Sequence, residues 1–250
     1  MLQTRNAQGI QLMKSSKLIF TLIAILSLSL MSQTVKAALV LDFDTDSYGN
    51  AIQAGQFIDD EYANWGINIT AYNQYGPDFA ITFDSANPTG NDPDLKTPGY
   101  NNSVDLNNVL ILPTYITDNN SDGYVDDPND QAGNNPGNIT FTFDQAQIGS
   151  VDIGFLDIEE SGTGMSLFLN NVAVGSVGIG TLGDNGYGEI STSSFYSDLT
   201  FDKVVVNLSG SGAIGTVTFD TTTVPEPASM SLLAIGALMI GMRPKRRNAH

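Results

Sequence analysis

Oxygen-bearing side chains alternate around a single glycine in the stretch DNNSDGYVDD, residues 118–127. Alternate residues of a tight turn converge on one point, and glycine supplies the positive φ that turns the chain. Numbered as a calcium loop, the stretch predicts as ligands Asp118, Asn120, Asp122, the backbone carbonyl of Tyr124, and Asp126. Asn129 stands where a bidentate glutamate is typical. The alternative is a solvated acidic turn.

A second group of carboxylates lies in NPTGNDPDLKTP, residues 87–98. Asp92 and Asp94 are two residues apart and each has a proline beside it or close by, so the segment is held in a turn. Carboxylate oxygens are ligands that calcium prefers. We therefore treat Asp92 and Asp94 as a second candidate metal site, with a proline-braced, solvated turn as the alternative.

Acidic pairs can also hydrolyse glycosidic bonds, provided that their separation suits the reaction and one of them keeps its proton. Asp157, Glu159 and Glu160 are the residues that could do so here. In a body with 26 acidic residues such pairs are unavoidable, and we expect no catalysis and no catalytic residues. A polysaccharide-active hydrolase or lyase that uses loop carboxylates is the alternative.

Aromatic side chains in loops can stack on sugars. The candidates for such a ligand contact are Tyr100, Tyr115 and Tyr124.

The charge of the chain excludes several classes of function. Between residues 38 and 224 two lysines stand against 26 acidic residues, which makes nucleic acid an implausible partner. The chain has no cysteine, and its one histidine is His250, so disulfides, thiolate chemistry and a histidine-dependent triad or zinc site are excluded. Divalent cations are the natural partner of so much negative charge, and calcium is the cofactor we expect.

The elements that position these residues are strands. Apolar and polar residues alternate over 40–44, 67–72 and 139–143, which is the signature of strands with one buried face. We expect further strands over 79–83, 109–112, 151–156, 165–169, 172–177, 199–208 and 214–219. We expect one short helix within residues 50–65, and two long functional loops over 84–108 and 113–138. The pattern predicts an all-β fold, a single antiparallel β-sandwich of jelly-roll type over residues 38–223.

The N-terminal residues read as a signal peptide, 1–37. Basic residues precede an apolar run over 18–31, and small residues follow before cleavage by signal peptidase after Ala37 or Ala38. The run is shorter than the ~20 residues that span a bilayer. Translation can start at Met1 or at Met13.

The C-terminal residues 224–247 combine Val-Pro-Glu-Pro, an apolar segment and an arginine-rich end. Together these resemble the PEP-CTERM sorting signal of exported proteins of Gram-negative bacteria. The resemblance implies that an exosortase recognises Pro225, Glu226 and Pro227 and removes the tail. It also implies a short transmembrane helix that tethers the chain to the inner membrane in transit, before delivery to the cell surface or extracellular matrix.

The body also resembles the uncharacterised "DPDL" exported β-sandwich proteins, which carry a TGGDPDLGTP loop. The corresponding segments here are TGNDPDLKTP at 89–98, GNITFTF at 137–143 and FLDIEE at 155–160, which together cover about a third of the body. Asn91 and Lys96 replace glycines of that loop. The resemblance implies no settled activity.

These observations predict an exported, calcium-stabilised, non-catalytic surface or matrix protein. We expect an adhesive or structural role, and weak contact with carbohydrate such as exopolysaccharide.

Overall fold

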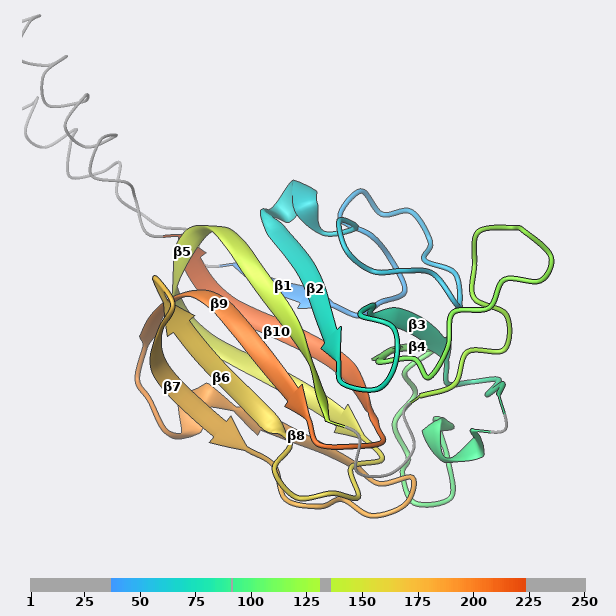
Figure 1. Ribbon diagram of the computed structural model, residues 1–250. Coiled ribbons are helices and arrows are strands. Elements are labelled where there is room, and N and C mark those ends of the chain that lie inside the picture. The colour runs from blue at the N-terminus through green and yellow to red at the C-terminus, as the bar shows by residue number, and fades with distance from the viewer. Residues whose placement is uncertain (1–36, 91, 131–135, 224–250) are drawn as a thin grey trace, which may run out of the picture. The chain divides into compact units, whose positions relative to one another are not determined.

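The computed structural model describes residues 37–90, 92–130 and 136–223 (Figure 1). Its regular elements are strands and short 3-10 turns. The strands are β1 (Ala37–Leu41), β2 (Ile67–Asn73), β3 (Ile81–Asp84), β4 (Asn108–Ile111), β5 (Gly137–Leu156), β6 (Gly164–Leu169), β7 (Val172–Gly178), β8 (Tyr187–Ser191), β9 (Leu199–Leu208) and β10 (Ala213–Thr223). The 3-10 turns are η1 (Ala63–Trp65), η2 (Pro93–Leu95) and η3 (Thr192–Ser194).

The long strand β5 belongs to both layers of the sandwich. Its first part, 137–143, pairs with β2 on one side and β9 on the other, and β9 continues to β6 and β7. Its second part, 147–156, pairs with β10 and β8, and β10 continues to β1, β4 and β3. The register with β9 shifts between Thr142 and Gln147, where β5 passes from one layer to the other. All of these pairings are antiparallel.

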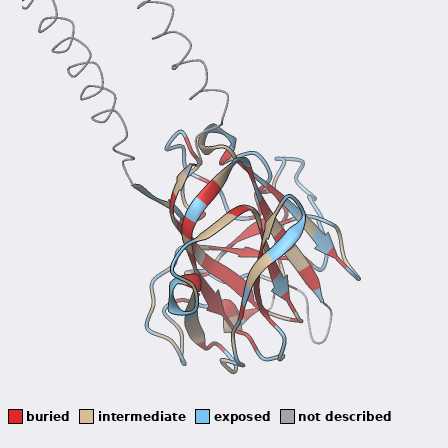
Figure 2. Ribbon diagram, turned by 90° about the vertical axis from the view of Figure 1, so that its left-hand side faces the viewer, coloured by how far each residue is buried: buried red, intermediate tan, exposed pale blue. Residues whose placement is uncertain are grey.

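Phenylalanines fill the space between the layers. Phe143 of β5 meets Phe219 of β10 edge-on with ring centroids 4.9 Å apart, and meets Phe201 of β9 at 5.6 Å. Buried residues are most frequent along the strands, and exposed residues occur both in the loops and at intervals along the strands (Figure 2). Alternating burial along β2 and the start of β5 is the pattern that predicted these strands. The prediction of an all-β antiparallel sandwich of jelly-roll type is confirmed.

The helix expected within residues 50–65 is wrong, apart from η1 at its end. The backbone there bonds to distant strand residues: Gly55 N–H donates to the Thr82 carbonyl and Ile58 N–H to the Ala80 carbonyl, both at 2.9 Å. Gly55 also has φ of +77°, which is outside the helical region. Tertiary hydrogen bonds therefore replace the helical ones.

The strand predictions are otherwise close, with three differences. The strand predicted over 40–44 lies earlier in the chain, at Ala37–Leu41. The segments 139–143 and 151–156 are parts of one strand, β5, rather than two. Strand β8 was not predicted, because YGEIS at 187–191 contains a glycine and none of its residues is fully buried.

A smaller apolar cluster holds both long loops against β3 and β4 (Figure 1). Leu95 enters it from the first loop and Val125 from the second, and both are buried against strand residues such as Phe83. The loops are green and yellow-green in Figure 1 and lie on the β3–β4 side of the sandwich. This packing brings together acidic residues far apart in the sequence.

Candidate metal centre

Four separate segments bring acidic side chains to one place beside the smaller apolar cluster. Asp92 and Asp94 flank Pro93 at η2, and Asp130 lies in the second long loop. Asp157 follows β5 directly and Asp184 precedes β8. We call Asp92, Asp94, Asp130 and Asp157 the carboxylate cluster.

Local backbone geometry aims Asp157 into the cluster. Its φ is +60°, so the chain turns sharply where β5 ends, and its N–H donates to the Gly186 carbonyl at 2.8 Å. A positive φ is uncommon for a residue other than glycine and costs free energy. The side chain accepts from the Asn185 N–H at 2.6 Å through Oδ1.

The hydrogen bonds that the carboxylate cluster accepts come from neutral groups. Asp130 Oδ2 accepts from the Gly212 N–H at 2.6 Å, and Asp92 Oδ2 accepts from the Asp130 N–H at 3.1 Å. The Ser211 hydroxyl lies 3.2 Å from Asp130 Oδ2 and 3.0 Å from Asp157 Oδ2. Because a hydroxyl has one hydrogen, it can satisfy only one of these carboxylates at a time.

Asn185 fixes the loop around the carboxylate cluster without adding charge. It is fully buried, and its amide group donates to the carbonyls of Asp94 at 2.6 Å and Lys96 at 2.8 Å. Its own Oδ1 accepts from the Asn101 N–H at 3.1 Å. The segment before β8 is thereby tied to the loop that carries Asp92 and Asp94.

Three of the four carboxylates are almost inaccessible to water: Asp92 is 7 % exposed, Asp130 5 % and Asp157 1 %. Asp94 is partly buried, and its Oδ1 is enclosed without a hydrogen-bond partner. Of the two lysines among the described residues, Lys96 is exposed and the Lys203 ammonium donates to Asn171. Burying unpaired charge costs several kcal/mol per ion, so protons or a cation must neutralise this site.

Burial raises the pKa values of these groups. It raises the pKa of Asp157 to about 7, an effect that the hydrogen bond from the Asn185 N–H opposes and the negative charge of Asp94 reinforces. Burial is also the main cause that raises the pKa of Asp130 and of Asp92, and the hydrogen bond with Asp94 raises that of Asp92 further. Burial without a counter-charge disfavours the ionised form of each group, and neighbouring carboxylates add to this, so a divalent cation would stabilise the ionised forms.

The oxygen atoms are close enough to share one ion. Carboxylate oxygens of Asp94, Asp157 and Asp184 all lie within 4.8 Å of one another. Two ligands of one calcium ion, each ~2.3–2.6 Å from it, can be at most about 5 Å apart. An all-oxygen donor set suits calcium, magnesium or manganese rather than zinc or copper.

The predicted calcium loop is exposed and bonds internally. Asp118 accepts from the N–H groups of Ser121 at 2.7 Å and Gly123 at 3.0 Å, and Asp122 accepts from the Tyr124 N–H at 2.9 Å. The Asn120 amide reaches Asp122 at 3.0 Å and Asp126 at 3.3 Å. These hydrogen bonds gather the predicted ligand residues around one turn. However, Asp118, Asp122 and Asp126 are not among the groups whose carboxylate oxygens all lie within 4.8 Å of one another. Calcium binding here stays a prediction.

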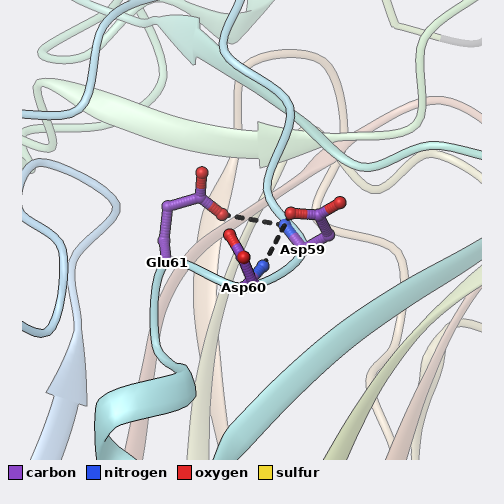
Figure 3. Close-up of side chains that lie close together, drawn as sticks. All are labelled: Asp59, Asp60 and Glu61. Carbon is purple, nitrogen blue, oxygen red and sulfur yellow. Dashed lines mark hydrogen bonds between the residues drawn. The ribbon is translucent and has the colours of Figure 1, made fainter.

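A third acidic group consists of Asp59, Asp60 and Glu61, close to the start of η1 (Figure 3). The Glu61 carboxylate accepts from the Asp59 N–H at 2.8 Å and from the Gln56 amide at 2.9 Å. Asp59 and Asp60 are exposed. These hydrogen bonds shape the turn.

The candidate aromatic residues have different surroundings. The Tyr100 hydroxyl donates to Asp184, whereas the Tyr115 hydroxyl donates to the Asp127 carbonyl at 2.8 Å. Tyr124 is partly buried in the calcium loop. Of the three, Tyr115 lines a pocket of about 630 Å³ between the long loops.

Sequence reasoning found part of the carboxylate cluster. Asp92 and Asp94 were candidate metal ligands, and Asp157 was noted for catalysis only. Asp130, Asp184 and Asn185 were missed as members of one site. The local signals were Asp157 at the end of a strand and Asp130 within a long loop. Neither signal shows that the two side chains lie close together in the fold.

Two predictions lie outside the described residues: the sorting motif Pro225, Glu226 and Pro227 with its helix, and most of the signal peptide. Within the described residues no helix has the length and apolar character needed to cross a bilayer.

No family model and no curated protein matches this chain. Among solved structures, it is similar to a chitosan-binding module from a chitosanase/glucanase of Paenibacillus sp. IK-5, at 14 % identity and TM-score 0.26 over 36 % of this chain and 73 % of that one. A family 35 carbohydrate-binding module from an environmental isolate aligns at 13 % identity and TM-score 0.25, over 44 % and 87 % of the two chains.

A larger relative in structure is an isomalto-dextranase of Arthrobacter globiformis T6, complexed with panose. It aligns at 13 % identity and TM-score 0.32 over 76 % of this chain, and this chain covers 33 % of it. Likeness at these TM-scores carries no conclusion about function.

Proposed function

We propose that this protein is an exported, non-catalytic surface or matrix protein whose loops are held by calcium. The observation that supports this most directly is the carboxylate cluster, in which four acidic side chains from three segments are wholly or partly buried with neutral partners. A cation there would join both long loops and the end of β5. Its role is adhesive or structural, with weak binding of carbohydrate.

The route of export is a separate part of the proposal. The residues 224–247 resemble a PEP-CTERM signal, so an exosortase and signal peptidase would process the chain. The absence of catalysis is part of the proposal, and Asp130 and Asp157 are assigned to holding the loops, because both are buried and accept hydrogen bonds from backbone N–H groups.

Thermal unfolding of the purified full chain, with calcium and with chelator, tests the proposal. We expect calcium to raise the Tm. In Asp94→Asn the chelated chain should unfold at a higher Tm than the chelated wild type, because one like charge is gone, and calcium should add little. A merely structural role of Asp94 would not produce this pair of changes.

Asp122→Ala is the matched control in the exposed loop. It should keep most of the calcium-dependent rise in Tm, since the buried site is intact. If Asp122→Ala abolishes the rise and Asp94→Asn does not, the calcium acts at residues 118–126 instead. An identical Tm with calcium and with chelator would remove calcium from the proposed function.

A further inference from the structure

The two long loops enclose a pocket beside the carboxylate cluster. Its volume is about 630 Å³, and Asp92 belongs both to its lining and to the cluster. Pro88, Thr89, Gly90 and Pro93 complete one side, with Tyr115 and Asp127 on the other. This volume lies in the range of ~300–1,000 Å³ that is typical of small-molecule sites.

Hydrogen bonds between the loops hold the pocket open. The Asn129 amide donates to the Gly90 carbonyl at 2.6 Å, and the Thr89 hydroxyl donates to the Pro128 carbonyl at 3.3 Å. A Cβ on Gly90 would come within 2.7 Å of the Pro128 carbonyl oxygen, so only glycine allows the loops to approach this closely. The site is therefore formed before a ligand arrives, which lowers the entropic cost of binding.

The Tyr115 ring is a fixed, accessible surface in this pocket. Its hydroxyl is anchored on the Asp127 carbonyl at 2.8 Å, and 38 % of the side chain is exposed. The pyrrolidine rings of Pro88 and Pro93 add further rigid apolar surface. Such surfaces suit a ligand with a flat face of C–H groups.

The charged side chains that line the pocket are the carboxylates of Asp92 and Asp127. Asp127 is exposed, and among the described residues its carboxylate makes no hydrogen bond that would compete with a ligand. No basic side chain is among the described residues that line the pocket. An anionic ligand such as a phosphate, sulfate or uronate would thus meet only negative charge.

We propose that this pocket binds one unit of a neutral polysaccharide. A sugar ring has a C–H face for Tyr115 and hydroxyl groups that donate to the Asp127 carboxylate. The inference rests on the proposed function, because the cation in the carboxylate cluster would neutralise Asp92 and hold its side of the pocket. It assigns the carbohydrate contact to Tyr115 rather than to Tyr100 or Tyr124.

Affinity electrophoresis of the full chain in calcium, through gels that contain neutral or uronate-bearing polysaccharides, tests this assignment. We expect at least one neutral glucan, galactan or mannan to retard the wild type. Tyr115→Ala should weaken binding roughly tenfold, which is the order of an aromatic contact. Tyr115→Phe keeps the ring and should retain most of the affinity, and Asp127→Asn should lower it.

Tyr100→Ala is the matched control, because Tyr100 is also an exposed loop tyrosine with a bonded hydroxyl. It should bind as the wild type does. The calcium-dependent rise in Tm should persist in Tyr115→Ala, which shows that the fold and the cation site are intact.

Three results would overturn the inference while calcium still raises the Tm: retardation by no neutral polysaccharide, equal retardation of Tyr115→Ala and wild type, or binding restricted to uronate polymers or basic peptides. A loss of the calcium effect in the wild type would instead contradict the proposed function. The two failures are therefore distinguishable.

Discussion

At the scale of residues, the Ser211 hydroxyl shows why the carboxylate cluster needs protons or a cation in addition to the hydrogen bonds that the chain supplies. It lies between Asp130 and Asp157 with one hydrogen to give. The sequence predicted Asp92 and Asp94 because their signal is local. It could not place Asp130 or Asp157 beside them, because each reaches the site through packing that depends on the whole fold.

The same residues predict the pH dependence of stability in the absence of metal. Burial raises the pKa of Asp157 from 3.8 to about 7, so between these pH values the folded chain holds a proton that the unfolded chain has lost. The free energy of unfolding of the chelated protein should therefore fall as pH rises from about 4 to about 7. Asp157 alone contributes at most on the order of 4 kcal/mol.

Urea unfolding in chelator at a series of pH values measures this pH dependence of the free energy of unfolding. The fall should be smaller in Asp157→Asn, which cannot ionise at that position. In calcium the trend should weaken or reverse, because the ion binds the deprotonated carboxylates. A chelated wild type that becomes steadily more stable across this pH range would show that Asp157 is ionised and compensated by another group.

At the scale of elements, alternation of apolar residues predicted most strands, because each has one buried face. It could not show that two segments join into β5, since the polar residues between them read as a turn. It also assigned residues 50–65 to a helix from their apolar spacing, although Gly55 bonds to β3 and to the calcium loop. The Val125 N–H donates to the Gly55 carbonyl at 2.9 Å.

Gly55 and Gly49 provide a matched pair that tests this contact. Both have positive φ, +77° and +83° respectively, but a Cβ on Gly55 would lie 2.3 Å from the Val125 carbonyl oxygen, whereas Gly49 has open space. Gly49→Ala should lose only the backbone cost, ~1–2 kcal/mol.

Gly55→Ala should lower the free energy of unfolding by more in total, ~3 kcal/mol or above, because the second long loop must also shift. Urea unfolding in calcium gives both free energies. Equal losses in the two variants would mean that the close packing of Val125 on Gly55 contributes nothing to stability.

At the scale of the whole molecule, residues 38–224 carry two lysines and 26 acidic residues, yet fold without any cysteine. The sandwich core does not need the cation, because its phenylalanines pack between layers away from the charges. The long loops do need it in our account, since few of their described residues, among them Leu95, Leu106 and Val125, pack in the smaller apolar cluster. Cation binding would thus rigidify the surface that the two long loops form.

The most direct test is the anomalous diffraction of crystals of the full chain grown in calcium and in a lanthanide that replaces it. Our account predicts a peak between the carboxylates of Asp94, Asp157 and Asp184, absent from Asp94→Asn crystals. Crystals that show a peak only at residues 118–126, or no peak at millimolar calcium, would contradict it.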